Sequence, residues 1–320
     1  MRVVATALVA LVVTVPHAAR GQKVTVVARH VPTPTAFAFG FGKVFVAGYG
    51  SEDDPNVRGG VYVLGGGKAV RLGGSPAHAS GLAFRDGTLY VSGGPQILAW
   101  SGWNGTSFAK RRVVATGPPG FYQFGGLAFR RDGVLYAGVA NAESVEPAAD
   151  HAAGKTPYAD DVLTVDVADG TIRVLSTGIR QPWQLLFVPG HAGPIVSDLG
   201  QDDLGAKRPP DWLIEATPGA DFGFPACPAA PAACATAAKP FVTFPPHTSP
   251  MGLAYLDGKL YVALFNGLGN RGPLVVTMPP RGGRLTTFLS GFDAGVIALG
   301  ASRGRIYAGD HAGTIYSVKP

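Results

Sequence analysis

Short apolar runs come in pairs along the chain, and a glycine or an Asp-Gly dipeptide separates the two runs of most pairs. A representative pair is Gly81-Leu-Ala-Phe-Arg-Asp-Gly-Thr-Leu-Tyr-Val91. A tight turn between antiparallel strands needs a positive φ, which glycine adopts at little cost. The pattern therefore predicts six β-hairpins, at residues 35–47, 81–91, 126–137, 183–198, 252–263 and 296–308.

The hairpins recur about every 45–70 residues, which is enough for a four-stranded propeller blade and its loops. Third and fourth strands are visible at residues 60–64 with 69–72, and at 162–165 with 172–175. The last copy ends one strand short, at Gly313-Thr-Ile-Tyr-Ser-Val318, whereas Lys23-Val-Thr-Val-Val-Ala28 precedes the first copy as a spare strand. Pairing these segments would leave no open edge. We therefore predict an all-β, six-bladed β-propeller over residues 22–320, with its ring closed by an N-terminal strand that completes the last blade. A β-sandwich or a solenoid also permits repeated hairpins, but neither predicts complementary termini.

The first residues have the pattern of a targeting segment. Arg2 precedes the 13-residue apolar run Val3–Val15, and small residues follow Pro16. This run is shorter than the roughly 20 residues that span a bilayer, so we predict a signal peptide at residues 1–21. A buried first strand and an uncleaved anchor are the alternatives. No later segment has membrane-spanning length, so the expected protein does not span a membrane and is secreted or periplasmic.

The two cysteines, Cys227 and Cys234, are separated by six residues. In an oxidising compartment they are expected to form a local disulfide, because they have no histidine neighbours for a zinc site. Closing so short a loop contributes roughly 2.5 kcal/mol.

The formal charge of +6 raises the question of nucleic acid. The basic residues are scattered, and the densest group, Lys110-Arg111-Arg112, lies in a strand-like run that fits a solvated outer edge. We therefore expect no nucleic-acid partner.

In a propeller, the loops that lead into the inner strands line the mouth of the central channel. All of these loops but the first carry His, Tyr, Arg, Gln or Asp; they are residues 31–35, 75–78, 117–124, 178–182, 245–250 and 291–294. Such residues are either simply solvated or form a site.

Five segments carry a more specific pattern: Gly178-Ile-Arg-Gln-Pro182, Asp198-Leu-Gly-Gln-Asp-Asp-Leu-Gly205, Pro209-Pro-Asp211, Pro218-Gly-Ala-Asp-Phe-Gly-Phe-Pro225, and Pro246-His-Thr-Ser-Pro-Met-Gly252. Together they resemble the soluble quinoprotein glucose and sorbosone dehydrogenase family, most strongly over about residues 178–255. Members of that family are six-bladed propellers that hold pyrroloquinoline quinone (PQQ) at the channel mouth and oxidise an aldose.

The resemblance implies a set of cofactor contacts. Arg180 matches the arginine that contacts the quinone, and a planar guanidinium suits its carboxylate or carbonyl oxygens. Gln181 replaces the family's asparagine, and His247 matches the histidine of the family's Pro-x-His-Ser segment. Arg180 as an inter-blade structural pair and His247 as a structural loop residue are the alternatives.

The resemblance also implies calcium. The backbone carbonyls of Gly200 and Gln201 match those that face the ion, and Asp198, Asp202 and Asp203 are oxygen donors of the kind that calcium prefers. Turn capping by these acids is the alternative.

The third copy departs from the family pattern. Family members carry a histidine there as general base, but Tyr122 falls at that position, among Phe121, Gln123 and Phe124. With an ordinary pKa of about 10, a tyrosine is a poor base at neutral pH. The catalytic residue therefore stays unassigned, and Arg271 is only a possible replacement for one of the family's later basic contacts.

These observations favour a PQQ-dependent dehydrogenase of a small sugar or aldehyde. A propeller of the same family that has lost the catalytic histidine and only binds a ligand or protein is the main alternative. A calcium-dependent lactonase is a third, although the loops are poor in acids for that class.

Overall fold

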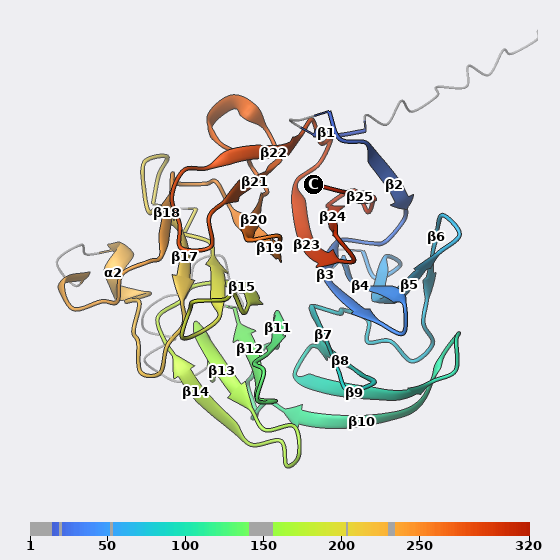
Figure 1. The fold of residues 1–320 in the computed structure, drawn as a ribbon. Coiled ribbons are helices and arrows are strands. Elements are labelled where there is room, and N and C mark those ends of the chain that lie inside the picture. The colour runs from blue at the N-terminus through green and yellow to red at the C-terminus, as the bar shows by residue number, and fades with distance from the viewer. Residues whose placement is uncertain (1–14, 19–20, 52–53, 141–155, 203, 230–233) are drawn as a thin grey trace, which may run out of the picture.

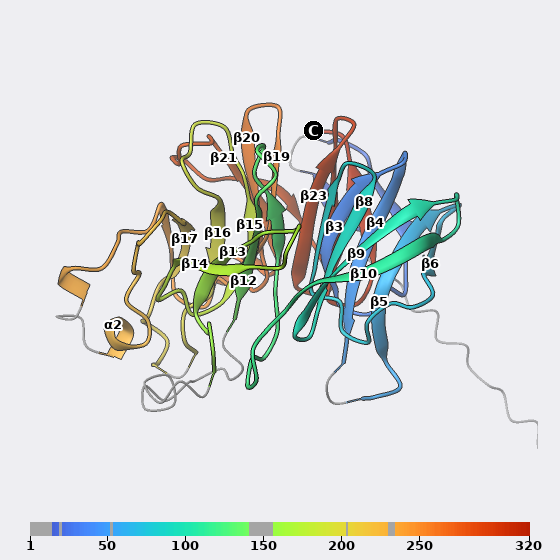
Figure 2. The ribbon, with the colours of Figure 1, turned by 90° about the horizontal axis from the view of Figure 1, so that it is seen from below.

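The computed structural model describes residues 15–18, 21–51, 54–140, 156–202, 204–229 and 234–320. Six antiparallel sheets stand around a central axis in a closed ring, so the predicted six-bladed β-propeller is confirmed (Figure 1). Seen from the side, the sheets stand roughly upright and the loops gather at the two ends of the ring (Figure 2). Asp203 and residues 1–14 of the predicted signal peptide lie outside the described residues.

The innermost strand of each blade comes first in sequence, and the chain then runs outward. Blade 1 contains β3 (Pro34–Gly40), β4 (Lys43–Gly50), β5 (Arg58–Gly65) and β6 (Lys68–Arg71), and blade 2 contains β7 (Gly81–Arg85), β8 (Thr88–Gly93), β9 (Gln96–Trp103) and β10 (Phe108–Thr116). Blade 3 contains β11 (Leu127–Phe129), β12 (Leu135–Val139), β13 (Asp161–Val165) and β14 (Ile172–Ser176), and blade 4 contains β15 (Pro182–Leu186), β16 (Ile195–Asp198), β17 (Asp211–Glu215) and β18 (Val242–Phe244). Blade 5 contains β19 (Pro250–Leu256), β20 (Lys259–Leu264), β21 (Leu274–Met278) and β22 (Thr286–Ser290), and blade 6 contains β23 (Val296–Ser302), β24 (Arg305–Asp310) and β25 (Ile315–Val318) with the N-terminal β2 (Val24–Ala28).

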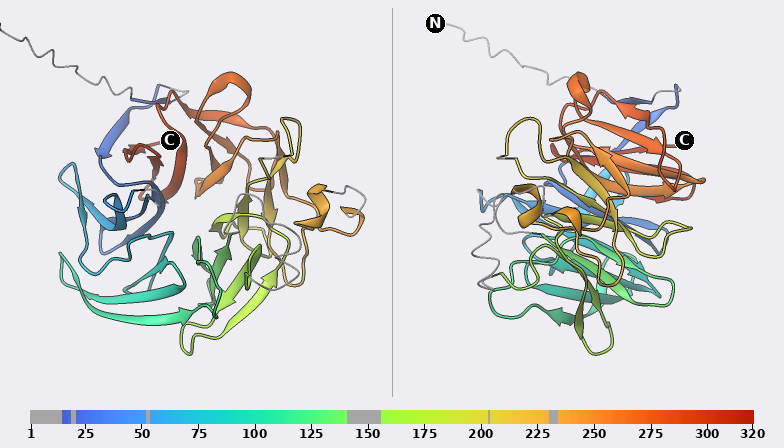
Figure 3. Two further views of the ribbon diagram at one scale, coloured as in Figure 1. Left: turned by 180° about the vertical axis from the view of Figure 1, so that it is seen from behind. Right: turned by 90° about the vertical axis from the view of Figure 1, so that its left-hand side faces the viewer.

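The two ends of the chain close the ring as predicted. Strand β2 pairs with β25 in antiparallel register, with Val24 opposite Val318, and so becomes the outer strand of blade 6. The view from behind shows the two strands side by side (Figure 3). The two-residue strand β1 (His17–Ala18), inside the predicted signal peptide, pairs with the outer edge of blade 5.

The repeated Ala-Phe and Leu-Tyr-Val segments make the contacts between blades. The described apolar core forms six clusters, and each cluster joins two neighbouring blades. In blade 2, the small Ala83 pairs across the sheet with Tyr90, and the Tyr90 ring meets Phe129 of blade 3 at 4.8 Å between centroids. Phe187 of blade 4 meets Tyr136 of blade 3 in the same way, at 5.0 Å. Each large aromatic side chain buried this way contributes about 1.5–3 kcal/mol.

Close approach at the axis explains the glycine of the repeat. A Cβ atom on Gly126 would overlap the carbonyl oxygen of Trp183 in the next inner strand. Blade 4 carries Gln184 at the equivalent position. Its Nε2 donates to the carbonyl oxygens of Leu253 and Leu299, at 3.0 and 3.3 Å, and its Oε1 accepts from the Leu253 N–H at 2.9 Å. Gln184 therefore ties three inner strands together, beside an axial cavity of about 370 Å³.

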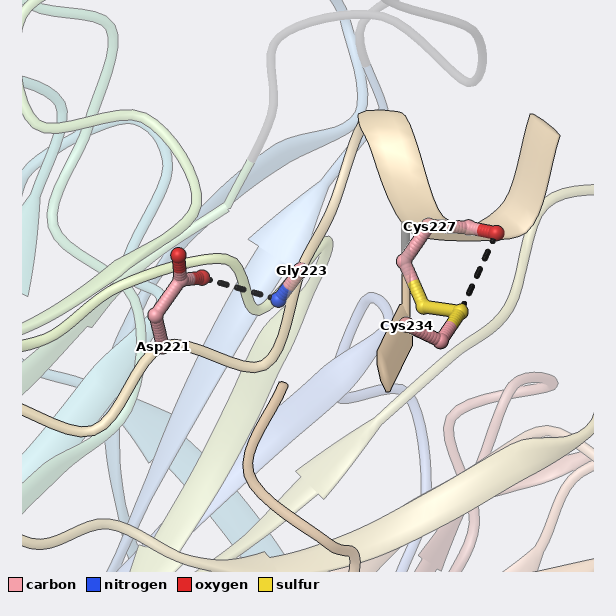
Figure 4. The surroundings of a disulfide bond; sticks show 4 residues. All are labelled: Asp221, Gly223, Cys227 and Cys234. Carbon is pink, nitrogen blue, oxygen red and sulfur yellow. Dashed lines mark hydrogen bonds between the residues drawn. A yellow bond between two sulfur atoms is a disulfide. The ribbon is translucent and has the colours of Figure 1, made fainter. Parts of the chain in front are cut away.

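The long excursion between β17 and β18 carries the predicted disulfide. Cys227 in the short helix α2 (Ala226–Ala229) is bonded to Cys234, as predicted (Figure 4). Asp221 precedes them in a turn, where its Oδ1 accepts from the Gly223 N–H at 2.8 Å. The 3₁₀ turn η2 (Gly269–Arg271) carries Arg271 at an exposed position. Among the described residues, no helix has the length and apolar character needed to cross a membrane.

Candidate functional site

We call the end of the ring that carries the loops into the inner strands the loop face, and the opposite end, with the tight turns, the hairpin face. On the loop face, the segments that carry the family resemblance meet at the entrances to blades 4 and 5. Thr177 and Gly178 exchange backbone hydrogen bonds with the segment from Ala220 to Phe224. Gly178 has a φ of 70°, and a Cβ atom there would overlap Asp221 Oδ1. Segments far apart in sequence thus form one compact entrance.

Arg180 lies at the centre of this entrance and is only 5% exposed. Because Pro182 of β15 pairs with Asp198 of β16, Arg180 faces the loop that follows β16. Its Nη1 donates to the carbonyl oxygens of Gly200 at 2.7 Å and Leu199 at 3.1 Å. The guanidinium plane is therefore anchored on the backbone of the 199–201 loop.

Asp198 faces the other side of the same entrance. It is 4% exposed, and its Oδ1 accepts from the Gln181 N–H at 2.8 Å. Burial raises the pKa of Asp198 to about 7, although the Gln181 N–H and the neighbouring Arg180 act in the opposite direction. A carboxyl group with such a pKa can exchange a proton near neutral pH.

Asp211 is a site residue that the sequence reasoning did not single out. It is 2% exposed, and its two oxygens accept from the N–H groups of Gly200 and Ser249, each at 2.7 Å. Burial raises its pKa, while these backbone N–H groups lower it. Asp211 therefore joins the 199–201 loop of blade 4 to the loop that enters blade 5. Its place in the Pro209-Pro-Asp segment was the available signal.

The close packing where Asp211 connects these two loops requires a glycine at position 200. A Cβ atom at Gly200 would lie 2.9 Å from the Pro209 ring and 3.0 Å from the carbonyl oxygen of Pro210. No side chain fits there without moving the backbone.

Gln201 contributes a buried acceptor. The residue is 7% exposed, and among the described residues its Oε1 has no hydrogen-bond partner. An unmet buried acceptor costs about 1–3 kcal/mol, so it favours a ligand that brings a donor.

His247 lies over the outside of the same loop, in a left-handed conformation with φ 61°. Its Nδ1 is 3.2 Å from Asp202 Oδ1, and its Nε2 is 3.2 Å from the Gly205 carbonyl oxygen. The Gly205 carbonyl and the Asp202 carboxylate raise the pKa of His247. The structure thus groups His247 with Asp202, and Arg180 with Asp198, Gln181 and Gly200.

The entrance to blade 3 is apolar. Phe121 and Phe124 are 8% and 0% exposed, and their ring centroids are 4.5 Å apart. Both belong to the cluster between blades 2 and 3. Tyr122 is half-buried between them in sequence, and no histidine stands in this loop.

A histidine does stand on the neighbouring loop. His78 precedes the inner strand of blade 2, and its Nδ1 is 2.8 Å from the Tyr49 carbonyl oxygen. Since a carbonyl only accepts, Nδ1 carries a proton in this contact, and in the neutral form of the ring the lone pair is then on Nε2. Among the described residues, no hydrogen bond reaches Nε2. The Tyr49 hydroxyl in turn donates to Gln123 Oε1 at 3.3 Å. Tyr49 therefore links His78 to the loop that enters blade 3.

The predicted calcium set is poorly suited to the ion. The Gly200 carbonyl oxygen accepts from a guanidinium, Asp198 Oδ1 accepts from Gln181, and Asp202 contacts His247. In the described part of the chain, no three His, Cys, Asp or Glu side chains are grouped for a metal. Asp203 of the predicted set lies outside the described residues.

Comparisons with known proteins support the fold. No protein-family model matches the sequence. No curated protein matches it either. Among solved structures, a Trichoderma reesei protein of carbohydrate-active enzyme family AA12 has a TM-score of 0.76 and 16% identity, covering 98% of this chain and 99% of the other. The PQQ-bound aldose sugar dehydrogenase from Streptomyces coelicolor has a TM-score of 0.71 and 18% identity, covering 95% and 99%. The chain has the fold of the soluble aldose sugar dehydrogenases. A Xanthomonas campestris gluconolactonase is less similar to this chain, with a TM-score of 0.61, 11% identity, and coverage of 95% and 94%.

Proposed function

We propose that the chain is an exported PQQ-dependent dehydrogenase of a small sugar or aldehyde, with its site at the loop-face entrances to blades 4 and 5. The observation that carries this proposal is the buried Arg180 guanidinium, which is anchored on the 199–201 loop. The same loop carries Gln201, whose buried Oε1 has no hydrogen-bond partner among the described residues. A buried cation and a buried acceptor on one loop suit a flat ligand that presents both carboxylates and a hydrogen-bond donor.

The residues have distinct parts in this proposal. Arg180 and Gln181 bind the quinone and fix its plane, and His247 and Tyr122 contact it from the loops entering blades 5 and 3. Bound PQQ supplies the group that accepts a hydride from the substrate carbon. The chain must supply the base that takes the hydroxyl proton.

We assign that base to His78. Its Nδ1 contacts the Tyr49 carbonyl oxygen at 2.8 Å, so that a neutral ring keeps its lone pair on Nε2. Tyr122 is the weaker candidate, because a phenol with an ordinary pKa of about 10 holds its proton at neutral pH. In this proposal, the base has moved from the blade 3 loop to the blade 2 loop.

The second candidate is a propeller of the same fold that binds a sugar or a protein without turnover. The apolar entrance to blade 3, which has Tyr122 where the family has a histidine, favours it. The first candidate turns its substrate over, whereas the second binds its ligand without turnover.

The test is a titration of the purified protein with PQQ, followed by tryptophan fluorescence and by dye reduction across a panel of aldoses and aldehydes. Saturable quenching with dye reduction supports the dehydrogenase. Quenching without reduction of dye by any substrate supports the binding protein. The absence of any response to PQQ contradicts the proposed function. Export is tested separately, by N-terminal sequencing of the secreted or periplasmic protein, which we expect to begin near Gln22.

A further inference from the structure

One of the two carbonyl oxygens that the family resemblance assigns to a calcium ion, that of Gly200, accepts a hydrogen bond from the chain itself. Arg180 Nη1 donates to the Gly200 carbonyl oxygen at 2.7 Å and to the Leu199 carbonyl oxygen at 3.1 Å. These two carbonyls form a small cradle, and a fixed positive group already lies in it. The side chain is 5% exposed, so water does not compete for these bonds.

The cradle is rigid. The Gly200 N–H is held by Asp211, whose other oxygen holds the Ser249 N–H, each at 2.7 Å. On the other side, Gly200 is packed so closely against Pro209 and Pro210 that it has no room for a Cβ atom. The carbonyl cannot simply rotate to serve a second cation elsewhere.

A calcium ion and the Arg180 guanidinium compete for the Gly200 carbonyl oxygen. Calcium requires six to eight oxygen ligands at about 2.3–2.6 Å. An ion on the Gly200 carbonyl would meet the positive Arg180 at close range in a site that excludes water, where like charges repel strongly. Displacing Arg180 would remove its two backbone hydrogen bonds and its charge from beside Asp198, a carboxylate with which it interacts. Breaking such a buried charge arrangement is strongly unfavourable.

We propose that Arg180 takes the place of calcium in this chain: its guanidinium, fixed in the carbonyl cradle of Leu199 and Gly200, supplies the positive charge that holds the carboxylates of an anionic planar ligand. The identity of that ligand as PQQ rests on the proposed function. The independence from calcium does not. Ligand binding is therefore metal-free, and the positive charge cannot be removed by a chelator.

The first experiment uses the wild-type protein and two measurements. After treatment with EDTA, the melting temperature is measured with calcium alone, and the affinity for PQQ is measured in EDTA and in millimolar calcium. We expect no shift in melting temperature with calcium and PQQ affinities within about threefold of each other. A saturable rise in melting temperature with calcium, or quinone binding that requires calcium, overturns the proposal.

The second experiment removes the guanidinium from the Leu199 and Gly200 carbonyl oxygens. Arg180→Ala is expected to lose at least about 100-fold in PQQ affinity in EDTA, because charge-assisted hydrogen bonds to the ligand are removed. It should also gain a rise in melting temperature with calcium, since the two carbonyls are released. Lys207→Ala, which removes a charge of the same sign from an exposed position on the same loop, should show neither effect. An Arg180→Ala protein that binds PQQ like the wild type contradicts the proposal.

The outcomes separate this proposal from the proposed function. If wild-type protein binds no PQQ in either buffer, the dehydrogenase proposal fails, and the calcium melting curves still decide whether Arg180 closes the cradle. If Arg180→Ala does not fold, the wild-type measurements with calcium alone decide it.

Discussion

The entrances to blades 3 and 4 lead into equivalent inner strands, but apolar side chains form the first and charged side chains form the second. At blade 3, Phe121 and Phe124 continue the apolar cluster between blades. At blade 4, Arg180, Asp198 and Asp211 are all less than 9% exposed and are held mainly by backbone hydrogen bonds. The repeated strands determine the ring in both cases, so the loops in front of them are free to differ.

The difference separates what folding needs from what a site needs. Burying Phe124 favours folding directly, whereas burying a charged group costs free energy unless each charge is paired and hydrogen-bonded. The loop that enters blade 3 is closed by the rings of Phe121 and Phe124, without a buried guanidinium. The buried Arg180 at blade 4 therefore has no counterpart in the closing of blade 3, and a ligand is a better explanation for it than stability.

The largest effect is expected at the apolar entrance. Phe124→Ala should lower the free energy of unfolding by about 4 kcal/mol, because a fully buried ring leaves a cavity. Quinone affinity should stay within about twofold. Denaturant unfolding and fluorescence titration measure the two quantities. Phe41→Ala, at a ring that is 44% exposed, is the control and should cost far less. Loss of quinone binding in a folded Phe124→Ala protein would place the aromatic pair in the site.

At the charged entrance, Asp211→Ala leaves two buried N–H groups without an acceptor, those of Gly200 and Ser249. We expect a loss of about 3 kcal/mol in unfolding free energy and weaker quinone binding, since the cradle loses its support. The control is Asp169→Ala, because Asp169 also accepts a backbone N–H, from Thr171 at 2.8 Å, but at an exposed turn. If Asp211→Ala and Asp169→Ala had equal effects, the burial of the Asp211 hydrogen bonds would make no additional contribution to stability or to quinone binding.

The third effect is expected at His78, the proposed base, and it is a change in kcat. His78→Gln should lower kcat by about 100-fold, which corresponds to about 2.7 kcal/mol, while quinone affinity stays unchanged. The acidic limb of the pH–rate profile should also disappear. Tyr122→Phe is the matched control at blade 3 and should leave kcat within about threefold. The opposite result for the two variants would return the base to blade 3.

The ring could be predicted from the sequence because its signals are local. The turn glycines and the paired apolar runs lie within about ten residues of each other, and the spare strand Lys23–Ala28 matched the missing one. Gln184 escaped notice because its partners Leu253 and Leu299 are 69 and 115 residues away.

The candidate site could be predicted only in part. The loop that faces Arg180 was found, but the content of the cradle was not, since nothing in the spacing says that the guanidinium occupies it. The two partners of Asp211 are 11 and 38 residues away, and the tautomer of His78 depends on Tyr49, 29 residues away. Such contacts arise from how blades meet, which no local pattern encodes.

The fourth prediction compares two buried carboxyls, one in each blade. Burial raises the pKa of both Asp198 in blade 4 and Asp161 in blade 3 to about 7. When the pKa of a carboxyl group is raised by folding, its protonated form stabilises the folded state. This contribution is complete below the pKa of the unfolded chain, near 4, and is lost as pH rises through 7. Each substitution, Asp198→Asn or Asp161→Asn, should flatten the pH dependence of the unfolding free energy between about pH 4 and pH 7. Only Asp198→Asn should also change quinone affinity. An effect of both on affinity would extend the site into blade 3.

The smallest effect is expected from the exposed pair His247 and Asp202, whose side chains are 32% and 71% exposed. The pKa of His247 is raised by the Gly205 carbonyl and Asp202, so its contribution is present below about pH 6.5 and is lost as pH rises through the raised value. Solvent screening limits that contribution to about 0.2–1 kcal/mol. His247→Gln should therefore shift the unfolding free energy at pH 5.5 by less than about 1 kcal/mol, and by less still at pH 8. A larger loss at both pH values would mean that the outer loop, and not the buried joint at Asp211, holds the blade 4 entrance in place.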